Sequence, residues 1–275
     1  MYGSKILNMK HNYKIIVLLL AGVAAIYTSC HKLDVNQNNN KSTVSKKDAS
    51  VQIAQSLVTI FNPENGSFDF KNGLTIPSDL TMNKKGKIKI QATNSNPQCG
   101  AKLDTTVTFS LADSDTSKIS IWLKVNYQLV CSGGIPSGLT VRDSLSMTVV
   151  SSDVTADARM GQNLTLTSLN PGVANSPYSF DGTVNSYAKI TNKKPSTSIP
   201  NIEGTFNYNF KSIIIDPKKD PDFITGGSAT FSSKGNIGKN VWNYKGTIQF
   251  LGGHKAKITI DGTAYTVDLI TGEVN

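Results

Sequence analysis

Few residues in this chain of 275 residues could carry out acid–base, nucleophilic or metal chemistry. Among the three histidines, only His254 lies far beyond the first 31 residues, and it follows a Gly-Gly turn that places it at the exposed start of a strand. A Ser-His-Asp arrangement could be built only around this residue. The sequence contains no G-x-S-x-G, H-E-x-x-H, C-x-x-C or P-loop motif. It therefore favours a non-enzymatic protein and indicates neither a zinc site nor a cofactor.

Carboxylates are the remaining candidates for chemistry. Asp216, Asp220 and Asp222 gather in one predicted loop, and carboxylate oxygens of this kind can bind Ca²⁺. Lys218 and Lys219 lie between them and the spacing is not that of an EF-hand, so we expect a solvated turn without a metal. A glycoside hydrolase needs two carboxyl groups about 5–9.5 Å apart, which linear spacing does not reveal.

One helix is expected before the strands that must position these residues. Apolar side chains recur at helical spacing over residues 48–61. Asp48 can cap the N-terminus, and Pro63 lies just beyond the end. We expect the apolar stripe of this helix to cover a sheet.

After the helix, apolar and polar residues alternate as they do in strands with one buried face, most clearly over 119–131. Four turn dipeptides suit two-residue hairpins: Asn72-Gly73, Asp181-Gly182, Gly252-Gly253 and Asp261-Gly262. The last strands are expected at Val241–Leu251, His254–Ile260 and Thr263–Ile270. These patterns predict a mainly β, antiparallel meander sheet, packed as a sandwich or curled into a partly closed barrel. Residues 191–200 form either a long loop within this domain or a division between two subdomains.

Two cysteines, Cys99 and Cys131, lie on strands that can form a hairpin around residues 113–117. If Leu111 lies opposite Ile119, the same register places Cys99 opposite Cys131. Directly opposed Cα atoms in antiparallel strands are about 4.5–5.5 Å apart, within the range of a disulfide. We predict a Cys99–Cys131 disulfide; two buried thiols are the alternative.

The chain is basic, with a formal charge of +9, but it has only two arginines, Arg142 and Arg159. Nucleic-acid-binding proteins favour arginine and cluster their basic residues, whereas the lysines here are scattered along the sequence. The composition argues against a nucleic-acid partner and favours a soluble, lysine-rich surface. Attraction to an anionic lipid or glycan is the alternative.

The two tryptophans are expected in different surroundings. Trp122 has the polar parity of its strand, where it could stack on a sugar or lie beneath the helix, and we expect the helix to cover it. Trp242 shares the parity of Tyr244 and Ile248, which predicts that it belongs to the core.

The first thirty residues have the three parts of a secretory signal. Three lysines precede the apolar run 15–26, which is shorter than the about 20 residues that span a bilayer. Thr28 and Ser29 then precede Cys30. The segment resembles the signal peptide of bacterial lipoproteins. This resemblance implies a signal peptide at 1–29, cleavage before Cys30, and acylation of that cysteine with chains such as palmitate.

The residues after Cys30 bear on location. The absence of aspartate at the following position, His31, points by the same resemblance to the outer membrane. Lys32 and Asp34 partly match the surface-export signal of some Gram-negative lipoproteins, so a surface-exposed location is favoured over a periplasm-facing one. Residues 30–47 are polar and without periodicity, which predicts a flexible tether before a domain at 48–275.

We therefore expect an exported, lipid-anchored envelope protein whose β domain has a binding or structural role, with a glycan or protein as ligand. An exposed aromatic row on one sheet face would favour a glycan. The alternative is a periplasm-facing carrier of a lipid or other apolar ligand, which needs a dry cavity of several hundred Å³. A carboxylate-dependent hydrolase is a third hypothesis.

Overall fold

A computed structural model describes residues 43–61, 80–82, 88–90, 99–113, 117–173, 175–194, 200–219 and 224–274. In this part the chain forms one helix, a ten-stranded sheet and a separate two-stranded sheet. The expectations for the signal peptide, for Cys30, Lys32 and Asp34, and for the Asn72-Gly73 turn concern residues outside it. No helix in the described ranges is long and apolar enough to cross a membrane.

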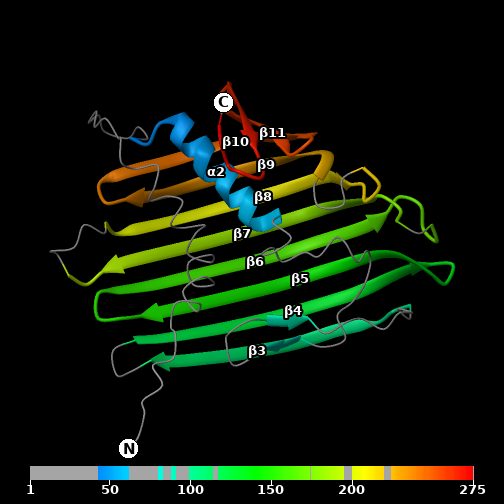
Figure 1. The fold of residues 1–275 in the computed structure, drawn as a ribbon, viewed down its shortest axis with the longest axis horizontal. Helices are drawn as coiled ribbons and strands as arrows, with labels where there is room; N and C mark the ends of the chain where they lie inside the picture. Colours follow the sequence, from blue (N-terminus) through cyan, green and yellow to red (C-terminus); the bar gives the residue numbers. More distant parts are fainter. Residues whose placement is uncertain are drawn as a thin grey trace, which may run out of the picture.

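The large sheet is a pure meander in which every strand pairs antiparallel with the next one in sequence (Figure 1). The elements are α2 (Lys46–Phe61), β1 (Leu80–Met82), β2 (Ile88–Ile90), β3 (Lys102–Asp113), β4 (Ser117–Ser132), β5 (Ile135–Val150), β6 (Val154–Ser168), β7 (Tyr178–Asn192), β8 (Ile202–Ile215), β9 (Ile224–Ile237), β10 (Asn240–Gly252), β11 (Lys255–Ile260) and β12 (Thr263–Asp268). The predicted mainly β, antiparallel meander with one helix is confirmed. The sheet stays open, with β3 and β12 at its two edges.

Turn residues with positive φ explain much of this connectivity. Asp261 and Gly262 join β11 to β12 with φ values of 45° and 80°, as a type I′ hairpin turn requires. The predicted turn at Asp181-Gly182 is wrong, because these residues lie within β7 at a register shift opposite β8. Gly182 has a φ of 137°, and a Cβ there would lie 2.1 Å from the carbonyl oxygen of Asn163. The glycine serves a β-bulge and not a hairpin.

Helix α2 begins two residues earlier than expected. Ser45 caps the N-terminus in place of the expected Asp48: the Asp48 N–H donates to Ser45 Oγ at 3.1 Å, and the Ser45 hydroxyl donates to Asp48 Oδ2 at 2.6 Å. Just before the helix, the Thr43 N–H donates to the Val241 carbonyl at 2.9 Å, and the Val44 side chain is buried. The end of the expected tether is therefore fastened to the start of β10.

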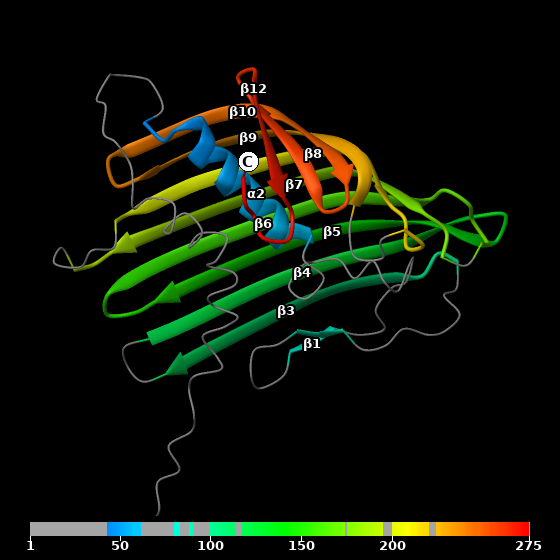
Figure 2. The ribbon, with the colours of Figure 1, turned by 45° about the horizontal axis from the view of Figure 1, so that its top comes forward.

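The helix covers one face of the sheet, over its C-terminal strands, and β11 and β12 come forward beside it (Figure 2). Its buried residues Ile53 and Leu57 belong to one apolar cluster with Phe180, Tyr208 and Ile248 of the sheet. We call the face that carries these residues the core face and the opposite face the polar face. Trp242 lies in the same cluster, as predicted.

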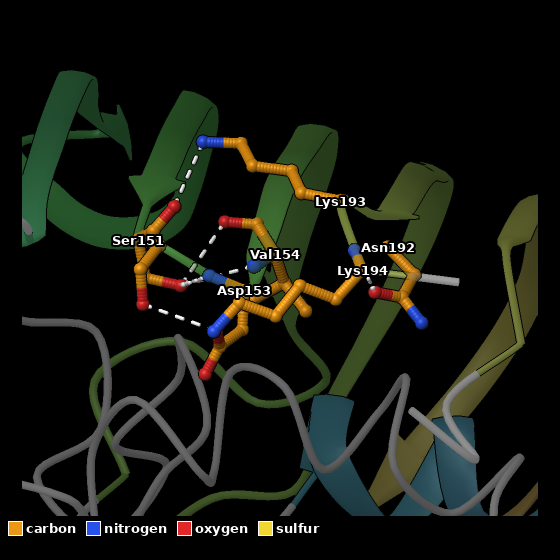
Figure 3. Close-up of polar contacts among 7 residues, drawn as sticks. Ser151, Asp153, Val154, Asn192, Lys193 and Lys194 are labelled. Atoms are coloured by element: carbon orange, nitrogen blue, oxygen red, sulfur yellow. Dashed lines mark hydrogen bonds and ion pairs between the residues drawn. The ribbon is translucent and has the colours of Figure 1, made fainter. Parts of the chain in front are cut away.

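Loops at the end of the sheet where α2 begins are tied to one another (Figure 3). The Lys193 N–H donates to the Asp153 carbonyl, and Lys193 Nζ donates to the Ser151 carbonyl, both at 2.8 Å. Lys194 forms an ion pair with the Asp153 carboxylate. These contacts fasten the β5–β6 turn to the chain that leaves β7. β7 ends before residue 193 and β8 begins after residue 201, and these two strands pair directly with each other. The strands before and after this stretch therefore belong to one sheet.

The register of the β3–β4 hairpin is the one predicted from the sequence. Leu111 lies opposite Ile119, and the pairing continues without a shift to Lys102 opposite Gln128. Cys99 and Cys131 are joined by a disulfide with a Cα–Cα distance of 5.6 Å. The edge strand β3 is thus linked covalently to its neighbour.

Candidate functional site

The polar face gathers nearly all the charge of the large sheet. Its alternate positions carry mainly Thr, Ser, Asn and Lys side chains, which point away from α2. Eleven basic residues lie on it: Lys102, Lys118, Lys124, Arg142, Arg159, Lys189, Lys211, Lys234, Lys245, Lys255 and Lys257. The acidic residues are Asp104, Asp157, Asp181, Glu203 and Asp268. Lysines scattered along the sequence therefore form one basic surface.

One row across the strands of this face carries two aromatic side chains. Trp122 of β4 lies opposite Ser146 of β5, which lies opposite Arg159 of β6, which lies opposite Tyr187 of β7. Neighbouring strands are about 4.8 Å apart, so the positions of Trp122 and Tyr187 are separated by about 14 Å. Trp122 is 40% exposed. Our expectation that the helix covers it is wrong, because α2 lies on the core face.

Tyr187 is held by polar partners on both sides. The guanidinium carbon of Arg159 lies 5.7 Å from the centre of the Tyr187 ring, within cation–π range. Arg159 also pairs with Asp157 at 2.8 Å. On the other side, the Tyr187 hydroxyl donates to Glu203 Oε1 at 3.1 Å. Desolvation, followed by the hydrogen bond to Glu203, raises the pKa of the Tyr187 hydroxyl.

Two open hollows flank the row. One, of about 380 Å³, lies beside Tyr187 over β7–β10; its polar-face lining is Tyr187, Glu203, Thr205, Lys234, Asn236 and Asn243. The other, of about 420 Å³, lies over β4–β6 on the side of Trp122; its polar-face lining is Lys124, Asn126, Arg142, Ser144 and Asn163. Asp143 and Gln162, whose side chains belong to the core face, also line it. We call the two hollows the tyrosine hollow and the arginine hollow. The two arginines of the chain thus lie on one face, two rows apart.

The tyrosine hollow has a floor of two glycines. Gly204 and Gly235 lie opposite each other, and on the core face the Trp242 ring fills the space that their side chains would occupy. A Cβ at Gly235 would lie 2.4 Å from Trp242 Cζ2. The Trp242 indole N–H donates to Ser233 Oγ at 2.7 Å, which fixes the ring in this position.

Two carboxylates of the polar face, Asp157 and Glu203, are both engaged in ion pairs. Asp157 and Glu203 lie in one row with Lys189 between them, about 10 Å apart by strand spacing. Each is held by a basic side chain, Asp157 by Arg159 and Glu203 by Lys189 at 3.5 Å. Only Glu203 lines a hollow. This arrangement lacks the two carboxyl groups that a glycosidase directs at one bond.

The loop with three aspartates is only partly covered by the described residues, and His254 lies within them. Asp216 accepts the Lys218 N–H at 3.1 Å and lies 3.8 Å from Lys219 Nζ, while Asp220 and Asp222 lie outside the described residues. Within the described ranges, no three His, Cys, Asp or Glu side chains come together as metal ligands. His254 occupies the β10–β11 turn with a φ of 60°.

An acidic group on the core face was missed by sequence reasoning. Asp143 of β5 is only 9% exposed, and Tyr127 of β4 donates its hydroxyl to Asp143 Oδ2 at 3.2 Å. Burial raises the pKa of Asp143 to about 7, although the hydrogen bond from Tyr127 opposes the shift. Burial and the Asp143 charge also raise the pKa of Tyr127. The signal in the sequence that could have revealed this buried acid is that Asp143 alternates in step with the apolar residues Val141 and Leu145 of its strand.

The space between α2 and the sheet is filled by side chains. Tyr208, Phe210, Ile53 and Leu57 are all among the fully buried residues, and the Phe180 and Phe210 rings pack edge to face at 5.7 Å. A carrier needs an unfilled apolar cavity in this position. The packing under the helix therefore gives the carrier hypothesis no support.

The polar face can stack a flat ring on Trp122, hydrogen-bond hydroxyl groups through its amide and hydroxyl side chains, and attract negative charge. No protein-family model, curated protein or solved structure matches this chain. The assignment of function therefore rests on the geometry of the face.

Proposed function

We propose that the protein is a lipid-anchored envelope protein whose polar face binds a polysaccharide without cleaving it. The observation that carries the proposal is the row of Trp122, Arg159 and Tyr187 across an open sheet face, with a hollow on either side. The contact of a large apolar indole with water is unfavourable, and this contact is removed when a partner covers the ring. The flat apolar surface of the indole matches the C–H face of a sugar ring.

The neighbouring side chains suit the hydroxyl groups of a sugar. Asn126 and Asn163 lie on either side of Arg142, and Thr205 and Asn243 line the tyrosine hollow. Amides and hydroxyls donate and accept at once, as sugar hydroxyls also do. Because the row runs across the strands, an extended chain of sugars could touch it at several points, and several weak contacts along one chain add up in affinity.

The attachment of the chain leaves the polar face open. Thr43 and Val44 are fastened at Val241, at one end of the sheet, and α2 then crosses the core face. If Cys30 carries the lipid, the 13 residues up to Thr43 would span about 20 Å as a flexible linker. An anchor at the sheet end, with the helix on the other face, suits a polar face that meets an extracellular polymer.

Affinity electrophoresis of the mature protein in native gels that contain single polysaccharides tests this proposal. We expect at least one polysaccharide to retard the protein, and Trp122→Ala to weaken binding about tenfold, as loss of an aromatic contact does. Val150→Ala is the matched control, since Val150 is an apolar residue on the same face with 38% exposure. Retardation by no polysaccharide, or equal losses in the two variants, would overturn the proposal.

A further inference from the structure

We infer that the polysaccharide is acidic, and that the arginine hollow holds a carboxylate of one of its sugar residues. This inference rests on the proposed function and names the class of ligand. It is carried by two basic side chains, Lys124 and Arg142, which line a hollow one row away from the exposed Trp122. The one carboxylate among the lining residues, Asp143, has its side chain buried on the core face.

Arg142 lies at the centre of a row of amides. Asn126 of β4 and Asn163 of β6 are its direct neighbours in the two adjacent strands. The nearest acid in this row, Asp104 of β3, accepts a hydrogen bond from Asn126 Nδ2 at 3.1 Å. Asp104 is thus held by the amide and stands two strands away from Arg142.

The charges of Arg142 and Lys124 are uncompensated in the described part of the chain. Both side chains are exposed, and neither forms an ion pair with a described residue. Arg159, two rows away from Arg142, differs, since Asp157 neutralises it at 2.8 Å. Two neighbouring cations without a partner leave a local excess of positive charge where a negative group would be stabilised.

The side chains around this charge match an acidic sugar. A guanidinium binds a carboxylate through two parallel N–H···O bonds, and such charge-assisted bonds are stronger than neutral ones. The flanking amides and Ser144 can bind ring hydroxyls. Trp122 lies two residues before Lys124 on the same face of β4, one row away from the lining residues Lys124 and Ser144.

The tyrosine hollow has a different character. It contains one acid, Glu203, and one base, Lys234, and is otherwise lined by amide and hydroxyl groups. A neutral sugar suits it better than an acidic one. We therefore place the acidic residue of the polymer over β4–β6, with the chain continuing across the strands toward Tyr187.

The probe is polygalacturonate, a polymer of uronic acid, compared with its fully methyl-esterified form, which has the same backbone without the charges. Binding to the mature wild-type protein is measured by affinity electrophoresis at low and at high salt. We expect polygalacturonate to bind at least about tenfold more tightly at low salt and to lose this advantage at high salt.

Two variants locate the carboxylate. We expect Arg142→Ala to lose about tenfold in binding to polygalacturonate and nothing toward the methyl ester, and Arg142→Lys to recover part of the loss. Lys257→Ala is the matched control, because it removes one positive charge from the same face on β11, six strands away. Unchanged melting temperatures establish that each variant is folded.

The outcomes separate this inference from the proposed function. Equal binding of both polymers, with Trp122→Ala still weakening it, overturns the acidic ligand and leaves the polysaccharide face intact. Equal losses for Arg142→Ala and Lys257→Ala overturn the hollow as the carboxylate site. If single-stranded DNA competes as well as polygalacturonate, the face binds polyanions in general and the inference fails.

Discussion

Replacement of Asp143 by asparagine should stabilise the protein much more at alkaline pH than at acidic pH. Asp143 is buried on the core face, and its pKa in the folded protein is about 7, against 3.8 for an exposed aspartate. Between these two pH values the unfolded chain has released the proton while the folded chain still holds it. Raising the pH therefore favours unfolding, and the contribution of this group to stability declines from about pH 4 until it is fully lost above pH 7.

The size of the effect follows from the difference between the two pKa values. A difference of about three units, at 1.36 kcal/mol per unit, gives about 4 kcal/mol above pH 7. This is an upper value, because a slight opening of the site to water recovers part of the cost of burying the charge. Asparagine has the same shape, carries no charge at any pH and can still accept the hydrogen bond from Tyr127.

Urea denaturation at pH 5 and at pH 8 measures the effect. We expect Asp143→Asn to gain several kcal/mol over wild type at pH 8 and to gain much less at pH 5. Asp104→Asn is the control, since Asp104 is exposed on the polar face. A wild-type stability that does not decline between pH 5 and pH 8 relative to Asp143→Asn would refute the reasoning.

Two further predictions concern the parts that hold the sheet together. Leu57→Ala should lower the free energy of unfolding by about 2–5 kcal/mol, because the Leu57 side chain on α2 is 0% exposed. Urea titrations measure this loss, and a loss below about 1 kcal/mol, as expected for an exposed residue, would contradict the packing described. Reduction of the Cys99–Cys131 disulfide should cost about 3–4 kcal/mol for a separation of 32 residues, provided that the unfolded chain is unstructured. Denaturation with and without reductant measures the second effect, and Cys131→Ser, which should be insensitive to reductant, controls for other effects of the reductant.

Local pattern and turn chemistry were sufficient to predict most of the sheet. Alternation set which side chains face the core, and one assumed pair, Leu111 opposite Ile119, fixed the register of the β3–β4 hairpin. The last hairpin followed from Asp261-Gly262, a dipeptide that suits positive φ. The turn before it lies at Gly253-His254, one residue beyond the predicted Gly252-Gly253. The same rule failed at Asp181-Gly182, because a positive-φ glycine is equally suited to a bulge, and only the partner strand decides between the two.

The candidate site was harder to predict because it depends on the order of strands in space. The parity of Trp122 and of the basic residues indicated a polar face, but the row from Trp122 to Tyr187 emerges only when β4 to β7 are aligned. The position of the helix was the second missing fact. It covers the face opposite Trp122, because the buried residues of the C-terminal strands lie there.

Acrylamide quenching of tryptophan fluorescence tests the central claim most directly. Trp122 is 40% exposed and Trp242 only 3%, so the quenching of the free protein comes mainly from Trp122, and a Trp122→Phe variant measures the remainder. With a polysaccharide bound to saturation, our account predicts that wild-type quenching falls to the level of that variant. If Trp122 stays as accessible in the complex as in the free protein, the polysaccharide binds elsewhere and the polar face is not the site.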